Sequence, residues 1–263
     1  METFNTESNQ QMEPALQPEQ ELNHSDKIVG VISEPKNIFE TISHFPLKTI
    51  DWLLPLILVL VILCVTTVIT MNNPEVKMKA KQQQEKVLNE MVAKGTITQE
   101  QADKQLDMMS GSLAIIFPII GILIIGTIFF FIISAIYYLF AKAIFKDNGS
   151  FTSVLVANGL TGYIVIIQVI ITAVLTIAFG RLMMDTSAAA FVEADRGTIA
   201  GFFLAKLDPF SIWAYAVVAI GLAKLFKSQS TGKYFAMVFG IWIIGGLILF
   251  YIGKAVPFLR FGS

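Results

Sequence analysis

The residue types best suited to acid–base or metal chemistry are few in this sequence. The two histidines, His24 and His44, lie twenty residues apart in the amino-terminal region, a spacing that matches no set of metal ligands. Cys64 is the only cysteine, so neither a disulfide nor a cysteine metal site can form within the chain. The motifs H-E-x-x-H, G-x-S-x-G and the phosphate-binding P-loop do not occur. We therefore expect no catalytic residue, no cofactor and no metal site.

The apolar stretch at residues 154–179 contains polar side chains, among them Asn158, Thr161, Tyr163 and Gln168, and three of these, Asn158, Thr161 and Gln168, are candidates for a functional site. Thr161 and Gln168 are seven residues apart, so they share one face of a helix. In membrane proteins such side chains usually form hydrogen bonds between neighbouring helices. The alternative is that they line a polar path for a solute or a lipid. Both interpretations remain open from the sequence.

A second group of candidates precedes a later apolar stretch and consists of Leu207, Asp208, Pro209, Phe210, Ser211 and Trp213. Asp208 is expected to cap a helix that begins at Pro209, because its carboxylate can accept from free N–H groups and proline has no donor to lose. Phe210 and Trp213 suit an aromatic anchor at a membrane interface. A clean start of a membrane helix accounts for the whole group, and a binding role is the alternative.

The elements that must position these residues are membrane helices. The chain is 54% hydrophobic and 15% charged, with a mean hydropathy of +0.66, which is more apolar surface than a water-soluble fold could bury. We predict an all-α integral membrane protein, a bundle of five transmembrane helices within residues 51–255. A net charge of −1, without basic clusters, argues against a nucleic-acid partner. The predicted spans are residues 52–70, 113–145, 154–179, 210–226 and 234–253.

The segments outside the spans are polar or amphipathic. Residues 1–25 are expected to be a disordered polar tail, residues 26–50 an amphipathic interfacial segment interrupted at Pro35, and residues 256–263 a short tail. Residues 72–111 contain six lysines and six acidic residues. Thr98 and Gln101 have the spacing of a capping box, so this insertion is expected to be a helical hairpin between the first two spans.

The distribution of lysine and arginine favours a cytoplasmic amino terminus. The linker from Lys224 to Lys233 has three positive charges and no acid, whereas the loop from Arg181 to Asp208 has three positive charges and four acids. Since cytoplasmic loops are enriched in positive charges, the Lys224–Lys233 linker is placed inside. With five spans, the amino terminus is then inside and the carboxyl terminus outside.

The sequence LDPFSIW at residues 207–213, followed by Ala219-Ile220-Gly221-Leu222, resembles a signature of bacterial members of the Ypt/Rab-interacting protein (YIP) family. The segment IVGVISEPKNIF at residues 28–39 is similar to that family's amphipathic stretch before the first span, and the charged insertion recurs there. The resemblance covers about residues 26–255. It implies a five-span membrane domain with a cytoplasmic amino terminus, located in the cell membrane, which is the inner membrane in a bacterium.

The resemblance also implies a class of function. Eukaryotic relatives bind small Rab-type GTPases, but this sequence lacks their D-x-Y-G-P motif, which makes GTPase binding doubtful here. The leading hypothesis is a non-enzymatic, multi-pass membrane protein that organises or recruits partners. Its expected partners are membrane lipids and other membrane proteins or a second copy of itself. The alternative is a transporter, channel or lipid-handling protein with a polar path along the third span.

Overall fold

The computed structural model describes residues 21–108 and 113–255, and within these ranges the chain is helical with no strand. Most of the expected amino-terminal tail, and the expected tail at 256–263, lie outside the described residues. The helices are α1 (His24–Ser33), α2 (Pro35–Ile42), α3 (Ile50–Met71), α4 (Pro74–Ala93), α5 (Gln99–Met108), α6 (Leu113–Ala143), α7 (Phe151–Ala178), α8 (Ala188–Phe191), α9 (Ile199–Lys206), α10 (Pro209–Leu225), α11 (Thr231–Gly240), the π-helical turn η1 (Ile241–Gly245) and α12 (Gly246–Ala255).

Four helical segments are long and apolar enough to cross a membrane. They are α3, most of α6, α7, and the segment Thr231–Lys254 that joins α11, η1 and α12. The pair α9 and α10 passes the same test only together, and it is bent by 63°. The sequence predicted a span at 210–226 but missed α9. Pro209 prevents one continuous helix, and the eight residues of α9 are too short to stand out as a span of their own. The bundle therefore has up to five spans.

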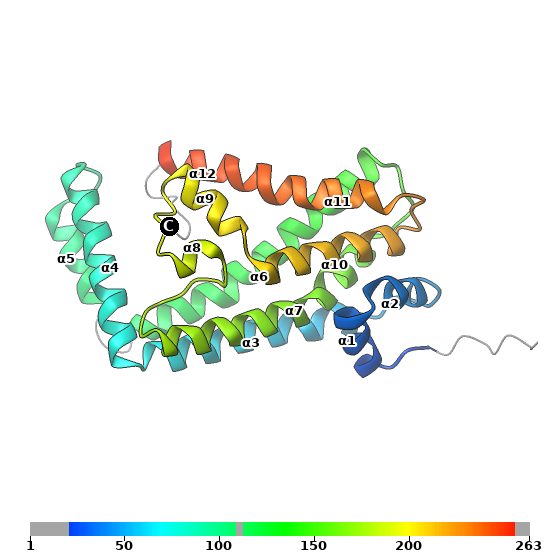
Figure 1. Cartoon of the computed structure of the whole chain (residues 1–263), viewed down its shortest axis with the longest axis horizontal. Coiled ribbons are helices and arrows are strands. Elements are labelled where there is room, and N and C mark those ends of the chain that lie inside the picture. Colours follow the sequence, from blue (N-terminus) through cyan, green and yellow to red (C-terminus); the bar gives the residue numbers. More distant parts are fainter. Residues whose placement is uncertain (1–20, 109–112, 256–263) are drawn as a thin grey trace, which may run out of the picture.

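Successive long helices run in opposite directions (Figure 1). Helices α1 and α2 lie at one end of the bundle, together with the α6–α7 and α10–α11 connections. The α4–α5 hairpin stands at the opposite end, with α8 and α9 nearby. The capping box predicted for α5 is confirmed, because Thr98 Oγ1 accepts from Gln101 N at 3.2 Å and Gln101 Oε1 accepts from Thr98 N at 2.9 Å.

The amino-terminal helices pack on the bundle through their apolar faces. Val31, Ile38 and Phe39 are buried in the core that α7 and α10 also form. The predicted interruption at Pro35 is confirmed, since Pro35 is the first residue of α2. Gly221 of α10 makes room for this packing, because a Cβ there would lie 2.9 Å from the Phe39 ring. The buried apolar residues of this segment thus contact protein, whereas Val29 is 64% exposed.

Large apolar side chains remain exposed along the outer faces of α3, α6 and α12. Side chains that face lipid must be apolar, because the hydrocarbon region offers no partner for a polar group. Rows of exposed apolar side chains on long helices therefore indicate surfaces that contact lipid. The chain is accordingly a multi-pass membrane protein. Examples on these three helices are Ile57, Val61, Val65, Ile120, Ile124, Ile128, Ile248 and Leu249.

Helices α3 and α7 approach closely at Gly159, where a Cβ would lie 2.5 Å from the Cα of Trp52. Gly159→Ala is therefore expected to force the two backbones apart and to lower the free energy of unfolding by about 1–3 kcal/mol. Thermal unfolding of the detergent-purified protein would measure this loss. Gly121→Ala in α6 is the control, because no atom lies within 4 Å of the added Cβ. Equal stability of the two variants would contradict the prediction.

Candidate functional site

The candidate site lies at the bend between α9 and α10 and centres on Asp208, which is buried. As the sequence predicted, Asp208 caps α10: its Oδ1 accepts from Phe210 N at 3.0 Å and Ser211 N at 3.3 Å. The same oxygen accepts from Thr186 Oγ1 at 2.8 Å. The other oxygen, Oδ2, accepts from Gln168 Nε2 at 2.7 Å. Four donors thus surround one carboxylate.

These contacts join three segments that are distant in sequence. Gln168 comes from α7, Thr186 from the α7–α8 connection, and Asp208 from the bend. Among the described residues no lysine, arginine or histidine lies within ion-pair distance of Asp208, so neutral donors and the start of α10 alone stabilise its charge. The arrangement fits a shared hydrogen-bond acceptor that holds a bent span in place.

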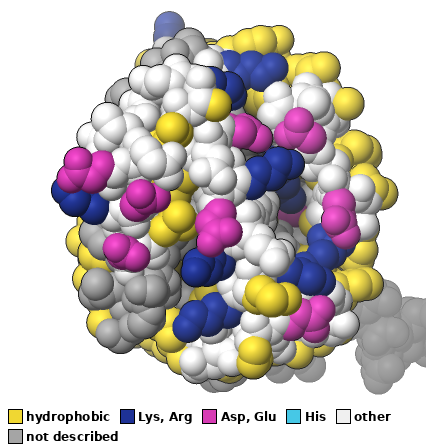
Figure 2. All heavy atoms as spheres, turned by 90° about the vertical axis from the view of Figure 1, so that its left-hand side faces the viewer, with side chains coloured by type: hydrophobic (Ala, Val, Ile, Leu, Met, Phe, Trp, Pro, Cys, Tyr) yellow, Lys and Arg dark blue, Asp and Glu magenta, His cyan; other side chains and the backbone are white. Residues whose placement is uncertain are grey.

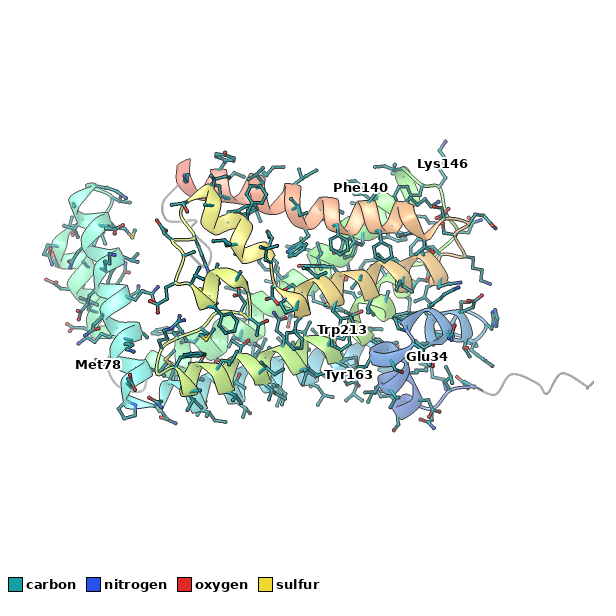
Figure 3. The ribbon with its side chains drawn as sticks, viewed as in Figure 1. Glu34, Met78, Phe140, Lys146, Tyr163 and Trp213 are labelled. Carbon is teal, nitrogen blue, oxygen red and sulfur yellow. The ribbon has the colours of Figure 1, made fainter. Side chains whose placement is uncertain are left out.

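The other residues of the cluster have structural positions around Asp208. Leu207 is 58% exposed, and its carbonyl accepts from Ala188 N at 3.0 Å. Pro209 is the first residue of α10. The Phe210 and Trp213 rings lie 6.3 Å apart, and Trp213 packs against the core in the middle of the bundle (Figure 3).

The three polar residues predicted on the third span have separate partners. Asn158 Nδ2 donates to Ser134 Oγ of α6 at 3.1 Å, a contact between helices. Thr161 is buried and donates to the carbonyl of Ala157 in its own helix at 2.8 Å. Gln168 binds Asp208 and also lines a cavity of about 260 Å³ between α3 and α7. Of the three, Gln168 alone lies both at the candidate site and on this cavity.

A second buried cluster, at the other end of the bundle, was missed by sequence reasoning. Lys27 Nζ of α1 lies 2.7 Å from Asp51 Oδ2 of α3, and both side chains are almost fully buried. His24 Nε2 is 2.6 Å from the hydroxyl of Tyr163, and His24 Nδ1 is 3.5 Å from Asp51 Oδ1. Tyr163 lies on α7 close to α1 (Figure 3). This cluster fastens the amino-terminal helices to the membrane domain.

Two further ion pairs connect segments at that same end, and the acid of each pair, Glu40 or Asp147, lies outside the spans. Lys224 Nζ lies 2.7 Å from Glu40 Oε2, and its hydrogen bond holds the pKa of the Glu40 carboxyl below its ordinary value. Asp147 accepts from Lys233 and from the Tyr234 hydroxyl, each at 2.9 Å. Burial alone would raise the pKa of Asp147, but these hydrogen bonds outweigh it and the pKa is lowered. The pairs tie α2 to α10 and the α6–α7 connection to α11.

Among residues 21–108 and 113–255 there is no group of three or more His, Cys, Asp or Glu side chains placed to hold a metal ion. The model of the Yip1 domain matches residues 29–253, from the middle of α1 through the hairpin insertion to the next-to-last residue of the final span. No curated protein and no solved structure matches the chain. Because the match covers more than half of the sequence, the chain belongs to the Yip1 domain family.

Proposed function

We propose that this protein is a non-enzymatic membrane protein that recruits a protein partner through the α4–α5 hairpin. The observation that carries the proposal is that the hairpin buries only a few apolar side chains and exposes its charged ones. Val76, Leu88 and Ala102 of the hairpin are buried, while its charged side chains remain exposed. A projecting element with an exposed, charged surface suits docking by another molecule.

Two of the six lysines on the hairpin have no partner in an ion pair among the described residues. Four lysines pair with acids four residues away on the same helix, as in Lys79 with Glu75 at 3.2 Å. Lys77 and Lys86 are exposed and have no acid within ion-pair distance among the described residues. Figure 2, which faces the hairpin end, has lysine, arginine and acidic side chains spread over it. The unpaired lysines favour a partner with an acidic surface.

The double variant Lys77→Glu/Lys86→Glu is expected to lower crosslinking to such a partner in intact membranes by about tenfold or more, because two attractive contacts become repulsive. Thermal stability in detergent should change little, since exposed charges contribute about 1 kcal/mol or less each. Quantitative mass spectrometry of the crosslinked partner, relative to the bait, measures the effect.

The matched control is Lys36→Glu/Lys142→Glu, which changes the net charge equally through two exposed lysines at the other end of the bundle. It should leave crosslinking unchanged. If the control abolishes crosslinking while the hairpin variant retains it, the recruiting surface lies at the amino-terminal end and the hairpin assignment is wrong.

A second function, transport of a solute or handling of a lipid, is favoured by a different observation. Gln168 of the third span lines the cavity between α3 and α7, as a polar path along this helix requires. Liposomes in which the purified protein moves neither solutes nor lipids faster than protein-free liposomes would contradict this function.

Three finer assignments complete the proposal. We assign the chain to the bacterial type of the family, supported by the charged insertion and by the absence of a D-x-Y-G-P motif. We place it in the cell membrane with its amino terminus in the cytoplasm, supported by the three positive charges and no acids between Lys224 and Lys233. A protease added to sealed, inside-out vesicles should then cleave this linker and spare the α4–α5 hairpin.

A further inference from the structure

Two lysines at one end of the bundle have a backbone conformation that lysine rarely adopts. Lys146 follows α6 and Lys227 follows α10, and their φ angles are 56° and 52°. In this left-handed region the Cβ of a residue other than glycine is crowded against the backbone. Glycine is the residue usually found there, because it has no Cβ. A strained backbone that carries lysine instead of glycine indicates a use for the ammonium group.

Both lysines lie in turns that close the end of a helix. The N–H of Asp147, which follows the first lysine, donates to the carbonyl of Ala141 at 3.2 Å. The N–H of Ser228, which follows the second, donates to the carbonyl of Ala223 at 2.9 Å. In each case the chain folds back on the helix that it leaves, and this requires the left-handed residue. The position therefore demands the conformation but not the lysine side chain.

The helix dipole does not account for these lysines either. A positive side chain is favourable near the carboxyl end of a helix, but the effect falls off within the last turn. Lys142 lies in the last turn of α6 and Lys224 in the last turn of α10, so both helix ends already have a positive charge. Glycine at positions 146 and 227 would relieve the strain and leave one lysine on each dipole.

The two turns are neighbours at the end of the bundle that also holds α1 and α2 (Figure 1). The rings of Phe145 and Phe226, which precede the two lysines, have their centres 5.2 and 6.0 Å from that of Tyr234. A Cβ at Gly149 would overlap the Phe226 ring, so the α6–α7 connection packs directly on the end of α10. The side chain of Lys146 extends away from the bundle (Figure 3). The two strained lysines thus belong to one surface.

This surface has more lysines than acids. Residues 142–150 and 224–233 together contain five lysines and one acid, Asp147. From α2, Glu40 also contacts the region, through Lys224. The other charged residues of α2 and its amino-terminal cap are one of each sign, Lys36 and Glu34.

Both of these acids are already paired. Asp147 lies 2.8 Å from Lys233, and Glu40 lies 2.7 Å from Lys224. The three remaining lysines are exposed and have neither an ion pair nor a hydrogen bond among the described residues. We call them the lysine patch, which consists of Lys142, Lys146 and Lys227. The patch carries three positive charges that no described acid neutralises.

The lysine patch adjoins apolar side chains that face lipid. Leu139 and Ile144, at the end of α6, are 61% and 60% exposed. Because α6 spans the membrane as far as Ala143, Lys142 and Lys146 lie at the depth of the headgroups. A phospholipid could place its acyl chains on the apolar side chains and its headgroup beside the lysines. A soluble partner would leave the apolar side chains uncovered, so the arrangement favours a lipid.

We propose that the lysine patch binds the headgroups of anionic phospholipids, whose acyl chains lie against the last turns of α6. Lysines next to a span attract anionic lipids, and each contributes roughly a fivefold gain in affinity. The patch is at the opposite end of the bundle from the α4–α5 hairpin. Binding of lipid there is independent of recruitment by the hairpin and of transport.

The test compares two lipids with different headgroup charges. Phosphatidylglycerol has a net charge of about −1 and phosphatidylcholine has none, and both can carry identical acyl chains. The full-length protein, in detergent with equal amounts of both lipids, should retain phosphatidylglycerol in about tenfold excess or more by native mass spectrometry. Equal retention of the two lipids overturns the proposal. An acidic protein that crosslinks to the patch in that case would assign the surface to a protein partner instead.

Lys146→Gly/Lys227→Gly removes two of the three charges and relieves the strain in both turns. It should lower the excess of phosphatidylglycerol by about fivefold or more, while the midpoint of thermal unfolding stays equal or rises. Lys146→Asn/Lys227→Asn repeats the measurement if the glycine variant does not fold, because asparagine also tolerates this backbone. Lys146→Arg/Lys227→Arg keeps the charges and should keep the lipid preference.

The matched control is Lys77→Gln/Lys86→Gln, which removes two exposed, unpaired lysines from the α4–α5 hairpin. It should retain the preference for phosphatidylglycerol. A preference that survives in the glycine variant, or that the control loses equally, overturns the proposal. A lower unfolding midpoint in the glycine variant would show that the lysines serve stability, and loss of the preference in the arginine variant would show that charge does not carry it. Either result also overturns the proposal.

Discussion

Lys27→Met is expected to lower the free energy of unfolding by about 3–5 kcal/mol, because it leaves Asp51 as a buried charge without its partner. The two side chains are 7% and 2% exposed, and their charged atoms are 2.7 Å apart. The partially exposed His24 lies 3.5 Å from the other oxygen of Asp51 and forms no hydrogen bond with it. Because Lys27 and Asp51 are almost fully buried, water is poorly placed to replace Lys27. Thermal unfolding of the detergent-purified variant measures the loss.

The double variant Lys27→Met/Asp51→Asn separates an unpaired charge from lost packing. It should recover most of the stability, because removing both members of a buried ion pair is often nearly neutral. Lys104→Met supplies the comparison at an exposed pair, since Lys104 and Glu100 are both more than 70% exposed. A pair of this kind contributes about 1 kcal/mol or less. If Lys27→Met is no more destabilising than Lys104→Met, the buried pair has no special role in fastening α1 to α3.

The features that the sequence predicted correctly are local ones. A long apolar run reveals a span, and the order Asp208-Pro209 reveals the start of a helix, because both depend on residues close together in the chain. Thr98 and Gln101 indicate the start of α5 in the same way. The all-α membrane fold and its helical insertion could therefore be derived from composition and spacing.

The features that the sequence missed depend on distant residues. Lys27 meets Asp51 only because α1 folds back on α3, and no spacing rule links residues twenty-four positions apart. Gln168 and Asp208, forty positions apart, meet only because the α9–α10 bend brings the start of α10 against α7. The threonines of α3 do not interrupt the apolar span in the sequence, because each can donate its hydroxyl proton to a carbonyl of its own helix. Their shared cavity appears only when α3 and α7 are packed together.

Asp208→Ala is expected to lower the free energy of unfolding by about 2–4 kcal/mol, more than the ~1 kcal/mol typical of losing a helix cap. The excess arises because two donors from other segments, Thr186 Oγ1 and Gln168 Nε2, lose a buried acceptor together with the first N–H groups of α10. Asp208→Asn keeps one oxygen for these donors and should lie between the wild type and Asp208→Ala. Chemical unfolding monitored by tryptophan fluorescence would measure the unfolding of the bundle, because Trp213 packs against its core.

Ser150→Ala is the matched control for this prediction, because Ser150 caps α7 and its side chain bonds only within its own turn. Ser150→Ala should lower the free energy of unfolding by only the ~1 kcal/mol typical of losing a cap. If Asp208→Ala costs no more than Ser150→Ala, the contacts from Thr186 and Gln168 contribute nothing to stability. If Asp208→Ala instead leaves stability unchanged and abolishes partner crosslinking, the residues around the bend form a recruiting surface. A stable variant with lost crosslinking would thus transfer the docking role from the α4–α5 hairpin to the Leu207–Trp213 cluster.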